Sequence, residues 1–373
     1  TFKSEKKDLL GLLAKTQNVV EKRNTMPILV NVLLDADGDR LKVFATDLEV
    51  SLTDEIKIQG QTGGKIAVNA KNTFEIIKEL NDGPIQFCKK ENNWLEIKQG
   101  KSVFNVIGIS ADEYPLFPTF STDSFTSVDA KMLLDMIDKT IYSVSSDETR
   151  YHLNGVYFEK SQDASSTQFR MVATDGHRLS LVDRKISAEV NQHFSKGIIV
   201  PRKGLNEIRK ILESVEGLFE MAVEGAQLVI RHQTTVLMVR LIEGKYPNYQ
   251  QLIPQNFKNE DVVKVDRNLF SSSLKRVSLL SNQKSKGITL TLSHGKLEIS
   301  SNNPELGDAK EEIEIDYSGD LMKIGFNAKY IMDILNCCDD HEIDIHLRDQ
   351  LSPGLLRPHN DKSYTCVVMP MRI

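Results

Sequence analysis

The chain of 373 residues repeats one sequence pattern three times. The motif ATDLEVSL at 45–52 recurs as ATDGHRLSL at 173–181, and a helical motif centred on Lys71 recurs around Lys203 and Lys329. The central lysines are 132 and 126 residues apart, so three copies fill the chain with little left over. Because solenoid repeats are only about 20 to 50 residues long, this period indicates whole domains in tandem.

The overall composition is that of an ordinary globular protein, with 40% hydrophobic and 27% charged residues. No apolar run approaches the roughly 20 residues that cross a bilayer, and the N-terminus lacks a signal-peptide core. The four cysteines form no CxxC pair, a usage typical of a reducing compartment. A cytoplasmic protein without a cysteine metal site is therefore expected.

Each copy is predicted to contain two helices and several short strands. Apolar spacings of three and four predict the first helices, and alternating apolar residues predict strands. The first helices are expected at 6–20, 130–144 and 267–281, and the second helices after Asn69, Pro201 and Asn327. Strands are expected at 41–46, 169–174 and 296–301, and closing strands at 94–109, which the Gly100 turn makes a hairpin, and at the counterpart 228–242. This pattern predicts an α+β unit in which two helices pack on an antiparallel sheet.

We therefore expect three domains, at 1–121, 122–256 and 257–373. Edge strands of such units can pair with a neighbour, so one sheet could extend from domain to domain. The linkers, near 120–129 and 254–266, are short and polar and lack the Gly and Ser of a flexible tether. A rigid arc is the expected arrangement.

Charge is unevenly distributed along the chain. The net charge of −5 would argue against a nucleic-acid partner, but this charge is divided unevenly. The six helical segments with their flanking residues together carry +10 and the remainder carries −15, counted over 3–23, 65–79, 131–150, 198–212, 264–276 and 323–333. A phosphate backbone would be attracted to a surface formed by these helices, through contacts that do not depend on base sequence. The alternative is that the lysines only solvate exposed helix faces.

The tetrad Asp175-Gly176-His177-Arg178 contains residue types that could serve as an acid/base pair or as metal ligands. No third ligand or nucleophile accompanies it, and the first copy has Leu48-Glu49 where Gly176-His177 stands. The sequence also lacks phosphate-binding loops, dinucleotide motifs and HExxH. It therefore favours a non-enzymatic binding protein without a cofactor, and a hydrolase centred on Asp175 and His177 is the competing hypothesis.

Several stretches resemble the bacterial DNA sliding clamp family, the β subunits of DNA polymerase III. The similar segments, which run in order over all three copies, are RYHLNGVYFE (150–159), VATDGHRLS (172–180), IIVPRKG (198–204), GKYPNYQQLIP (244–254), IGFNAKYIMDILN (324–336) and VVMPMRI (367–373). The resemblance implies three clamp domains per chain and a head-to-tail homodimer that closes into a ring around duplex DNA. It also implies a processivity factor that is associated with the nucleoid and has no catalytic residues.

The resemblance further implies three sets of functional residues. The DNA contacts would be Arg23, Lys71, Arg150, Tyr151, Arg202 and Lys203. The dimer interface would join Lys71, Lys101, Phe104 and Val106 of one subunit to Leu279, Leu280 and Glu305 of the other, with Asp308 and Glu311 nearby. A pocket for peptides similar to Q-L-x-L-F would be formed by Leu153, Thr174, Gly176, His177, Arg178, Leu179, Pro247, Gln251, Leu252, Asn327, Tyr330, Val367, Val368, Met369, Pro370, Met371 and Arg372.

The partners expected at this pocket are the replicative polymerase, the clamp loader, repair polymerases and mismatch-repair proteins. Aliphatic walls would take the leucine and phenylalanine of the peptide, and Met369 and Met371 could adapt to different partners. Two plainer interpretations stay open: Phe104 could belong to an ordinary core, and the Val-Val-Met tail could be a core strand. The competing function of the binding class is a repeat scaffold that does not enclose DNA.

Overall fold

The computed structural model describes residues 1–20, 26–60, 62–121, 125–163, 166–186, 194, 196–254 and 262–372. These residues form two compact units, each built from segments far apart in the sequence. The first unit contains Thr1–Lys131 and Lys203–Leu241, and the second contains Met132–Arg202 and Ile242–Ile373. The three-domain boundaries expected from the repeat remain a prediction.

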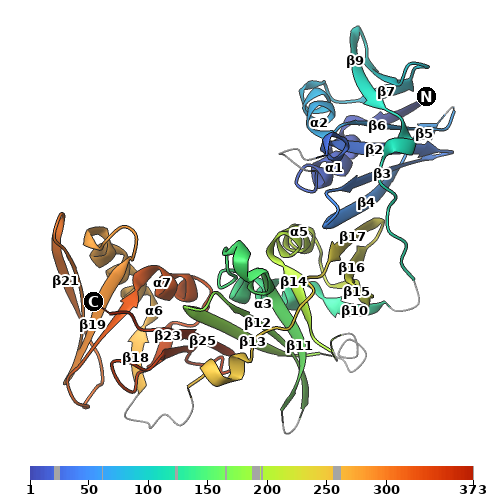
Figure 1. Cartoon of the computed structure of the whole chain (residues 1–373). Helices are drawn as coiled ribbons and strands as arrows, with labels where there is room; N and C mark the ends of the chain where they lie inside the picture. The colour runs from blue at the N-terminus through green and yellow to red at the C-terminus, as the bar shows by residue number, and fades with distance from the viewer. Residues whose placement is uncertain are drawn as a thin grey trace. The chain divides into compact units, whose positions relative to one another are not determined.

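The first unit is built on one antiparallel sheet of thirteen strands (Figure 1). Their order is β10-β15-β16-β17-β4-β3-β2-β6-β9-β8-β7-β1-β5. The bounds are β1 Phe2–Glu5, β2 Asn31–Asp37, β3 Arg40–Thr46, β4 Val50–Lys57, β5 Gln59–Gly60, β6 Gly64–Asn69, β7 Pro84–Lys89, β8 Trp94–Gln99, β9 Ser102–Ile109, β10 Thr126–Asp129, β15 Leu218–Glu224, β16 Gln227–His232 and β17 Thr235–Arg240.

The second unit contains an eight-stranded and a four-stranded antiparallel sheet. The larger has the order β14-β11-β12-β13-β25-β24-β23-β18 and the smaller β21-β20-β19-β22. The bounds are β11 Gly155–Asp163, β12 Ser166–Thr174, β13 Arg178–Lys185, β14 Ile198–Pro201, β18 Val262–Asp266, β19 Gly287–Ser293, β20 Lys296–Asn303, β21 Gly307–Glu314, β22 Met322–Asn327, β23 Glu342–His346, β24 Gly354–Pro358 and β25 Tyr364–Val368.

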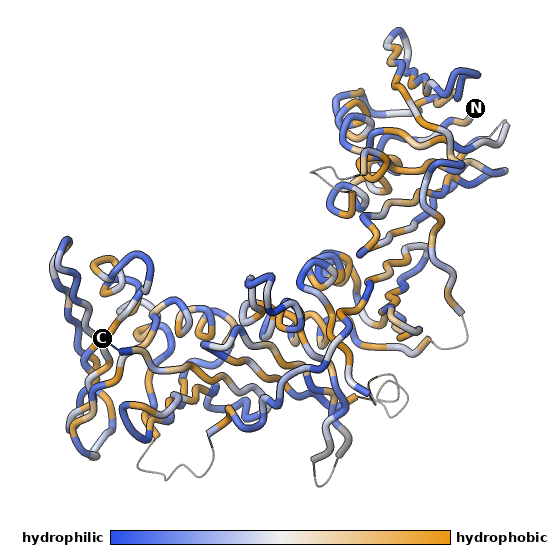
Figure 2. Tube along the Cα trace, viewed as in Figure 1, coloured by the Kyte–Doolittle hydropathy of each residue, from blue (hydrophilic) through white to orange (hydrophobic). Residues whose placement is uncertain are grey.

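Six α-helices in the described ranges correspond to the six expected from the repeat. They are α1 Lys6–Thr16, α2 Ala70–Glu79, α3 Ala130–Ile141, α5 Arg202–Leu212, α6 Arg267–Val277 and α7 Ala328–Asn336; short 3-10 helices are η1 Pro27–Val30, η2 Ala111–Glu113, η3 Glu148–Leu153, η4 Tyr249–Leu252 and η6 Ser278–Leu280. The helices mix hydrophobic and hydrophilic residues along each turn (Figure 2). Their hydrophobic side, such as Leu9, Leu12 and Leu13 of α1, is buried. The α+β prediction is confirmed.

The second helix of each copy begins at a residue that fixes its start. Asn69 accepts a hydrogen bond from the backbone N–H of Asn72 at 2.9 Å, and Asn327 accepts one from the N–H of Lys329 at 2.9 Å. Such side-chain caps satisfy donors that the helix itself leaves unpaired. Pro201 holds the corresponding position in the middle copy, and its fixed φ also suits a helix start.

Three predicted helices end earlier than their apolar spacing suggests. Helix α1 ends at Thr16 rather than residue 20, and its chain continues as tight turns in which Val19 and Val20 remain buried. In these turns both valine N–H groups donate to the carbonyl of Thr16 at 3.1 Å. The hydrophobic pattern therefore extends past the helix because the turn also faces the core.

Strands of consecutive copies pair with each other, as the edge-strand argument predicted. Strand β4 of the first copy pairs with β17 of the second, with Leu52 opposite Leu237. Strand β13 of the second copy pairs with β25 of the third, with Ser180 opposite Cys366. Each pairing carries a sheet across the sequence boundary between two copies, so each compact unit contains parts of two copies.

Gly204 supplies a test of how helix α5 packs. A Cβ added at Gly204 would lie 2.2 Å from Cγ1 of Val239 on β17. Gly204→Ala should therefore lower the unfolding midpoint in calorimetry, because overpacking costs about 1–3 kcal/mol while the gain in helix propensity is only about 1 kcal/mol. Val239→Ala in the same chain should restore part of the loss. A midpoint unchanged or raised in Gly204→Ala would contradict this packing.

Candidate functional site

The turn between β12 and β13 is held by its own side chains. The carboxylate of Asp175 accepts hydrogen bonds from the backbone N–H groups of His177 at 2.9 Å and Arg178 at 3.1 Å. The hydroxyl of Thr174 donates to the carbonyl of Arg178 at 2.7 Å. Gly176 has φ +91, and a Cβ there would lie 2.8 Å from the Arg150 guanidinium. The tetrad therefore has a clear role in holding the turn.

The same turn occurs in the first copy. Asp47 accepts from the N–H groups of Glu49 at 2.9 Å and Val50 at 2.7 Å. Leu48, at the position of Gly176, has φ +75, a conformation unfavourable for a leucine. The aspartate thus belongs to the shared framework, whereas Gly176 and His177 are particular to the second copy.

Arg178 anchors the wall behind this turn. Its side chain is only 8% exposed, and it donates to Asp175 at 3.1 Å and to Asp333 of α7 at 2.6 Å. A third hydrogen bond runs to the carbonyl of Tyr142 at 2.5 Å. The guanidinium also lies 4.5 Å from the ring centroid of Tyr330. The planar fork of arginine can satisfy several partners at once, so one side chain connects β13, α7 and the end of α3.

The apolar residues expected in the peptide pocket lie together. Leu153, Leu179 and Val367 belong to one buried hydrophobic cluster, and the half-buried Leu252 packs against it. Val368 is also fully buried in β25, so Val367 and Val368 belong to a core strand. We call the apolar surface of Leu153, Leu179 and Val367 beneath the turn the floor of the site.

The C-terminal tail is fixed beside this floor. The N–H of Met369 donates to the carbonyl of His177 at 2.8 Å, and the N–H of Met371 donates to that of Gly325 at 2.9 Å. Met369, Pro370 and Met371 are half-buried. The tail therefore reaches from the turn to β22, as a wall of the expected pocket would.

The remaining expected pocket residues lie at the surface of the same unit. Gly176, His177, Pro247, Gln251 and Arg372 are exposed, whereas Asn327 and Tyr330 are half-buried. The rings of His177 and Tyr330 stack with centroids 6.4 Å apart. Burial is the main cause that raises the pKa of Tyr330. The arrangement combines an apolar floor with a polar rim, although the role of each residue toward a peptide remains a prediction.

Sequence reasoning missed the residues that support this floor. Tyr246 stacks on Tyr157 with ring centroids 4.8 Å apart, and Tyr249 accepts a hydrogen bond from Arg170 at 3.1 Å. Burial, followed by a hydrogen bond to Glu159, raises the pKa of Tyr249 to about 12. The available signal was the recurrence of Tyr114-Pro115 as Tyr246-Pro247 in the next copy. This recurrence shows that the two positions are equivalent, but it does not show which side chains the tyrosine packs against.

The expected DNA-binding residues differ in how freely they face solvent. Lys71 and Tyr151 are exposed. Arg150 donates to Asp147 at 3.0 Å, Arg202 donates to the carbonyl of Val144, and Lys203 pairs with Asp47. Burial is the main cause that lowers the pKa of Arg202. Arg23 lies outside the described residues.

Several of the residues expected at a dimer interface are exposed apolar groups. Phe104 on β9 is 38% exposed, which disfavours the ordinary-core alternative, and Leu279 on η6 is 75% exposed. Val106 and Leu280 are half-buried, and Lys101 and Glu305 are exposed. Glu311 already pairs with Arg276 at 2.5 Å within the chain.

Three family models match the chain in succession. The N-terminal domain of the DNA polymerase III beta subunit matches residues 1–118, the central domain 127–248, and the C-terminal domain 250–372. A beta sliding clamp of Caulobacter vibrioides is 35% identical over 372 residues, with 99% of both chains covered. The chain belongs to the DNA polymerase III beta subunit family. The family assignment that the sequence motifs indicated is thereby confirmed.

Other sliding clamps support the same assignment. The beta sliding clamp of Pseudomonas putida is 32% identical over the full length of both chains. A solved clamp from Caulobacter crescentus matches with a TM-score of 0.93 at 34% identity, and one from Bartonella birtlesii bound to griselimycin matches with 0.94 at 32% identity. Both structures cover 100% of this chain and 99% of theirs. The three-copy clamp fold is therefore confirmed.

Neither a membrane span nor a metal cluster is found in the part of the chain that the structure describes. No helix there is both long enough and apolar enough to cross a bilayer. No group of three or more His, Cys, Asp or Glu side chains there is arranged to hold a metal ion.

The anchoring role of Arg178 gives a direct test. Arg178→Met should lower the free energy of unfolding by about 3 kcal/mol, because the carboxylate of Asp333 would lose its partner in a mostly buried position. Adding Asp333→Asn should recover part of that loss by removing the uncompensated charge. Denaturant unfolding of the two variants and the wild type measures both effects. Equal stability of Arg178→Met and the wild type would contradict the anchor.

Proposed function

We propose that two copies of this chain close head-to-tail into a ring that encircles duplex DNA and tethers the replicative polymerase to it. The observation that carries this proposal is the succession of three clamp-domain matches over residues 1–372. A ring made of two such chains would contain six related domains. Processivity would then follow from topology, because an enclosed DNA can slide through the ring without release.

The edge of β9 supports a head-to-tail interface. Val103, Phe104 and Ile107 are 47%, 38% and 68% exposed, an unusual set for one strand. The pairing of β9 with β6 involves only its last two residues, at Gly108 and Ile109. The apolar first part of β9 is therefore suited to bind another chain.

The other half of the interface would lie near η6 and β21. Leu279 and Leu306 are 75% and 49% exposed, and β21 pairs with β20 at the end of the four-stranded sheet. Because the two surfaces differ, their contact is heterologous, and such contacts form a closed ring when the rotation between subunits permits it.

The basic helices support DNA binding without sequence preference. Their excess positive charge would attract phosphates, while the acidic remainder of the chain would be repelled. Lys71 and Tyr151 are exposed and free to approach a strand, whereas Arg150, Arg202 and Lys203 hold internal contacts that they would share or exchange. Phosphate contacts of this kind fix no register, so the ring could slide.

The site around Arg178 supports the binding of partner peptides. Its floor of Leu153, Leu179 and Val367 could take the leucine and phenylalanine of a Q-L-x-L-F-like segment, and the rim could hydrogen-bond the glutamine. Solved clamps of Bartonella birtlesii and Pseudomonas aeruginosa bound to griselimycin show that relatives bind a ligand. Polymerases, the clamp loader and mismatch-repair proteins would compete for this one site.

The proposed role is non-catalytic, and the place of action is the nucleoid in the cytoplasm. Asp175 uses its carboxylate to hold a turn and to pair with Arg178, which disfavours the hydrolase alternative. A scaffold that does not enclose DNA is the second alternative. Such a scaffold would stay bound when circular DNA is cut, whereas a ring would slide off the ends.

Linearising a loaded circle tests encirclement. Labelled protein is loaded on nicked circular DNA with a clamp loader and ATP, and the circle is then cut with a restriction enzyme. The protein should co-elute with the circle and separate from the linear product in gel filtration. Retention on the linear DNA would contradict the ring.

The matched control is Leu279→Lys with Leu280→Lys. Charges at these apolar positions should prevent closure, halving the mass in light scattering and abolishing retention on the circle. Circular dichroism verifies that the variant is folded. A folded variant that still forms dimers would remove these leucines from the interface.

Removal of residues 369–373 tests the peptide site. The deletion removes the tail contacts to His177 and Gly325, so affinity for a Gln-Leu-Ser-Leu-Phe peptide should fall about 30-fold or more, as the loss of roughly 2 kcal/mol of apolar contact predicts. Leu351→Ala, in an exposed loop of the same unit, should leave the affinity unchanged. Calorimetric titration measures both, and equal affinity of the deletion and the wild type would refute the site.

A further inference from the structure

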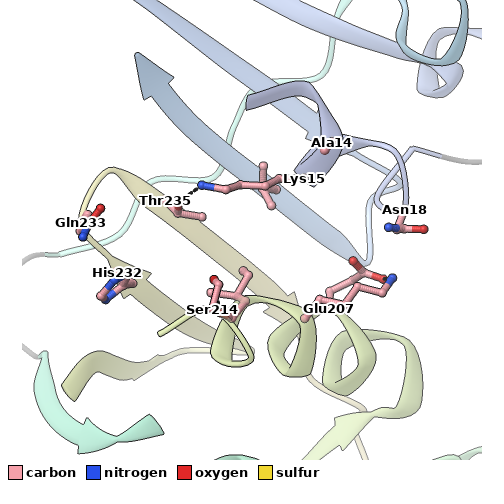
Figure 3. A pocket seen from close by; sticks show the side chains of 11 residues that line it. Ala14, Lys15, Asn18, Glu207, Ser214, His232, Gln233 and Thr235 are labelled. Atoms are coloured by element: carbon pink, nitrogen blue, oxygen red, sulfur yellow. Dashed lines mark hydrogen bonds and ion pairs between the residues drawn. The ribbon is translucent and has the colours of Figure 1, made fainter. Parts of the chain in front are cut away.

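The first unit contains a cavity that the proposed function does not use. Its volume is about 330 Å³, and it opens between the end of α1, helix α5 and the β16–β17 hairpin (Figure 3). Ala14, Leu52 and Ile211 form its apolar part, and Lys15 and Lys210 lie among its polar residues. We name it the α1–α5 cavity. Its size lies at the lower end of the range for small-molecule sites.

The repeat provides counterparts for two walls of this cavity, the end of α1 and the paired strands β4 and β17. Lys15-Thr16 near the end of α1 corresponds to Lys139-Thr140 near the end of α3. In both helices the threonine hydroxyl donates to a carbonyl one turn earlier, at 2.7 Å from Thr16 and 2.8 Å from Thr140. Two residues further on, Asn18 of the cavity therefore corresponds to Tyr142.

The strands give two more correspondences. Leu52 lies opposite Leu237 where β4 meets β17, and Ser180 lies opposite Cys366 where β13 meets β25. Because β4 and β13 follow the equivalent turns at Asp47 and Asp175, Leu52 corresponds to Ser180, and their partners Leu237 and Cys366 also correspond. Two residues before Leu237 and Cys366, Thr235 of the cavity corresponds to Tyr364.

In the second unit these counterparts fill the space. The hydroxyl groups of Tyr142 and Tyr364 are hydrogen-bonded at 2.8 Å, and that of Tyr142 also contacts Ser180 at 2.6 Å and the thiol of Cys366 at 3.4 Å. Tyr364 is fully buried. The α1–α5 cavity is lined by Asn18, Leu52 and Thr235. It therefore lies at the position that the rings of Tyr142 and Tyr364 fill in the second unit.

The cavity walls are held in place without a ligand. The buried carboxylate of Asp54 accepts from Lys15 at 2.6 Å and from Thr234 at the hairpin tip at 2.7 Å. Lys15 also donates to Thr235 at 2.9 Å (Figure 3). These bonds connect α1, β4 and the hairpin. A preformed site loses less entropy on binding than one that must first be ordered.

Two half-exposed lysine side chains lie at the mouth of the cavity. The side chains of Lys15 and Lys210 are 42% and 47% exposed, whereas their partners Asp54 and Glu207 are only 4% and 9% exposed. Each ammonium group pairs with one of these carboxylates, Lys15 with Asp54 at 2.6 Å and Lys210 with Glu207 at 2.7 Å, while part of each lysine side chain reaches solvent. An anionic group in the cavity would share these ammonium groups with Asp54 and Glu207, and His232 lies at the same cavity.

We propose that the α1–α5 cavity binds a small aromatic molecule that carries one anionic group. The ring would occupy the space that two tyrosine rings fill in the second unit, in contact with Leu52 and Ile211. The anion would lie at Lys15 and Lys210, and Asn18 and Thr235 would offer hydrogen bonds to a phenol or similar group. This site and the peptide site around Arg178 share no residues, because the first belongs to the first unit and the second to the second unit.

The test uses full-length protein and 3-(4-hydroxyphenyl)propionate as the probe. Ligand-observed NMR titration should give a Kd of about 1 mM or tighter, which is ordinary for a ligand of this size. The matching amide, 3-(4-hydroxyphenyl)propanamide, should bind about tenfold more weakly because it lacks the charge. Absence of binding by the acid, or equal binding of acid and amide, would overturn the proposal.

Two variants locate the binding. Asn18→Tyr with Thr235→Tyr copies the residues of the second unit into the cavity, and it should abolish binding of the acid while raising the unfolding midpoint. Ser214→Trp, an exposed position at the mouth, blocks entry without changing the interior and should also abolish binding. Circular dichroism verifies folding of both. Undiminished binding by a folded Ser214→Trp protein would place the probe elsewhere and refute the site.

Discussion

Pairing between strands of consecutive copies is the interaction on which the rest of the structure depends. Where β17 meets β4, the hairpin of the second copy is brought to the end of α1, and the α1–α5 cavity forms between them. Where β25 meets β13, the C-terminal tail is brought to the turn at Asp175. Both candidate binding sites therefore arise where one copy adds its last strands to the sheet of the copy before it.

The two junctions differ because the copies have diverged at a few positions. The aspartate that holds the turn is common to both, but Gly176 lets the backbone adopt its positive φ without a side chain, whereas Leu48 does so with one. In the interior, Tyr142 and Tyr364 fill a space that Asn18 and Thr235 leave open. A shared backbone thus presents a closed interior at one junction and an accessible cavity at the other.

Much of the fold could be predicted from the sequence, because the repeat tests each assignment three times. The starts of the helices and the α+β arrangement follow from spacings that recur in every copy. The ends of α1 and α3 could not be predicted, since the buried Val20 and Val144 continue the apolar pattern into turns. The exposure of Phe104 also needed the structure, because strand alternation does not tell which face is covered.

The candidate pocket was predicted by resemblance, whereas its supporting contacts were not. Leu153, Leu179 and Val367 do lie together, yet nothing local in the sequence connects Arg178 with Asp333, which is 155 residues away. Long-range ion pairs of this kind depend on topology, and a single sequence does not record which carboxylate an arginine meets. The α1–α5 cavity could not be predicted for a related reason. A cavity exists where packed side chains leave space, and this packing cannot be read from a single sequence.

The pairing of β4 with β17 also affects how the chain folds during synthesis. Leu52 and Leu237 are 185 residues apart, so at 5–20 residues per second roughly 10 to 40 s pass between the synthesis of the two strands. During that interval one edge of β4 has no partner, and exposed edges favour association between chains. The first copy must therefore remain soluble with an incomplete sheet, and early folding depends on the local hairpins and on α1 and α2.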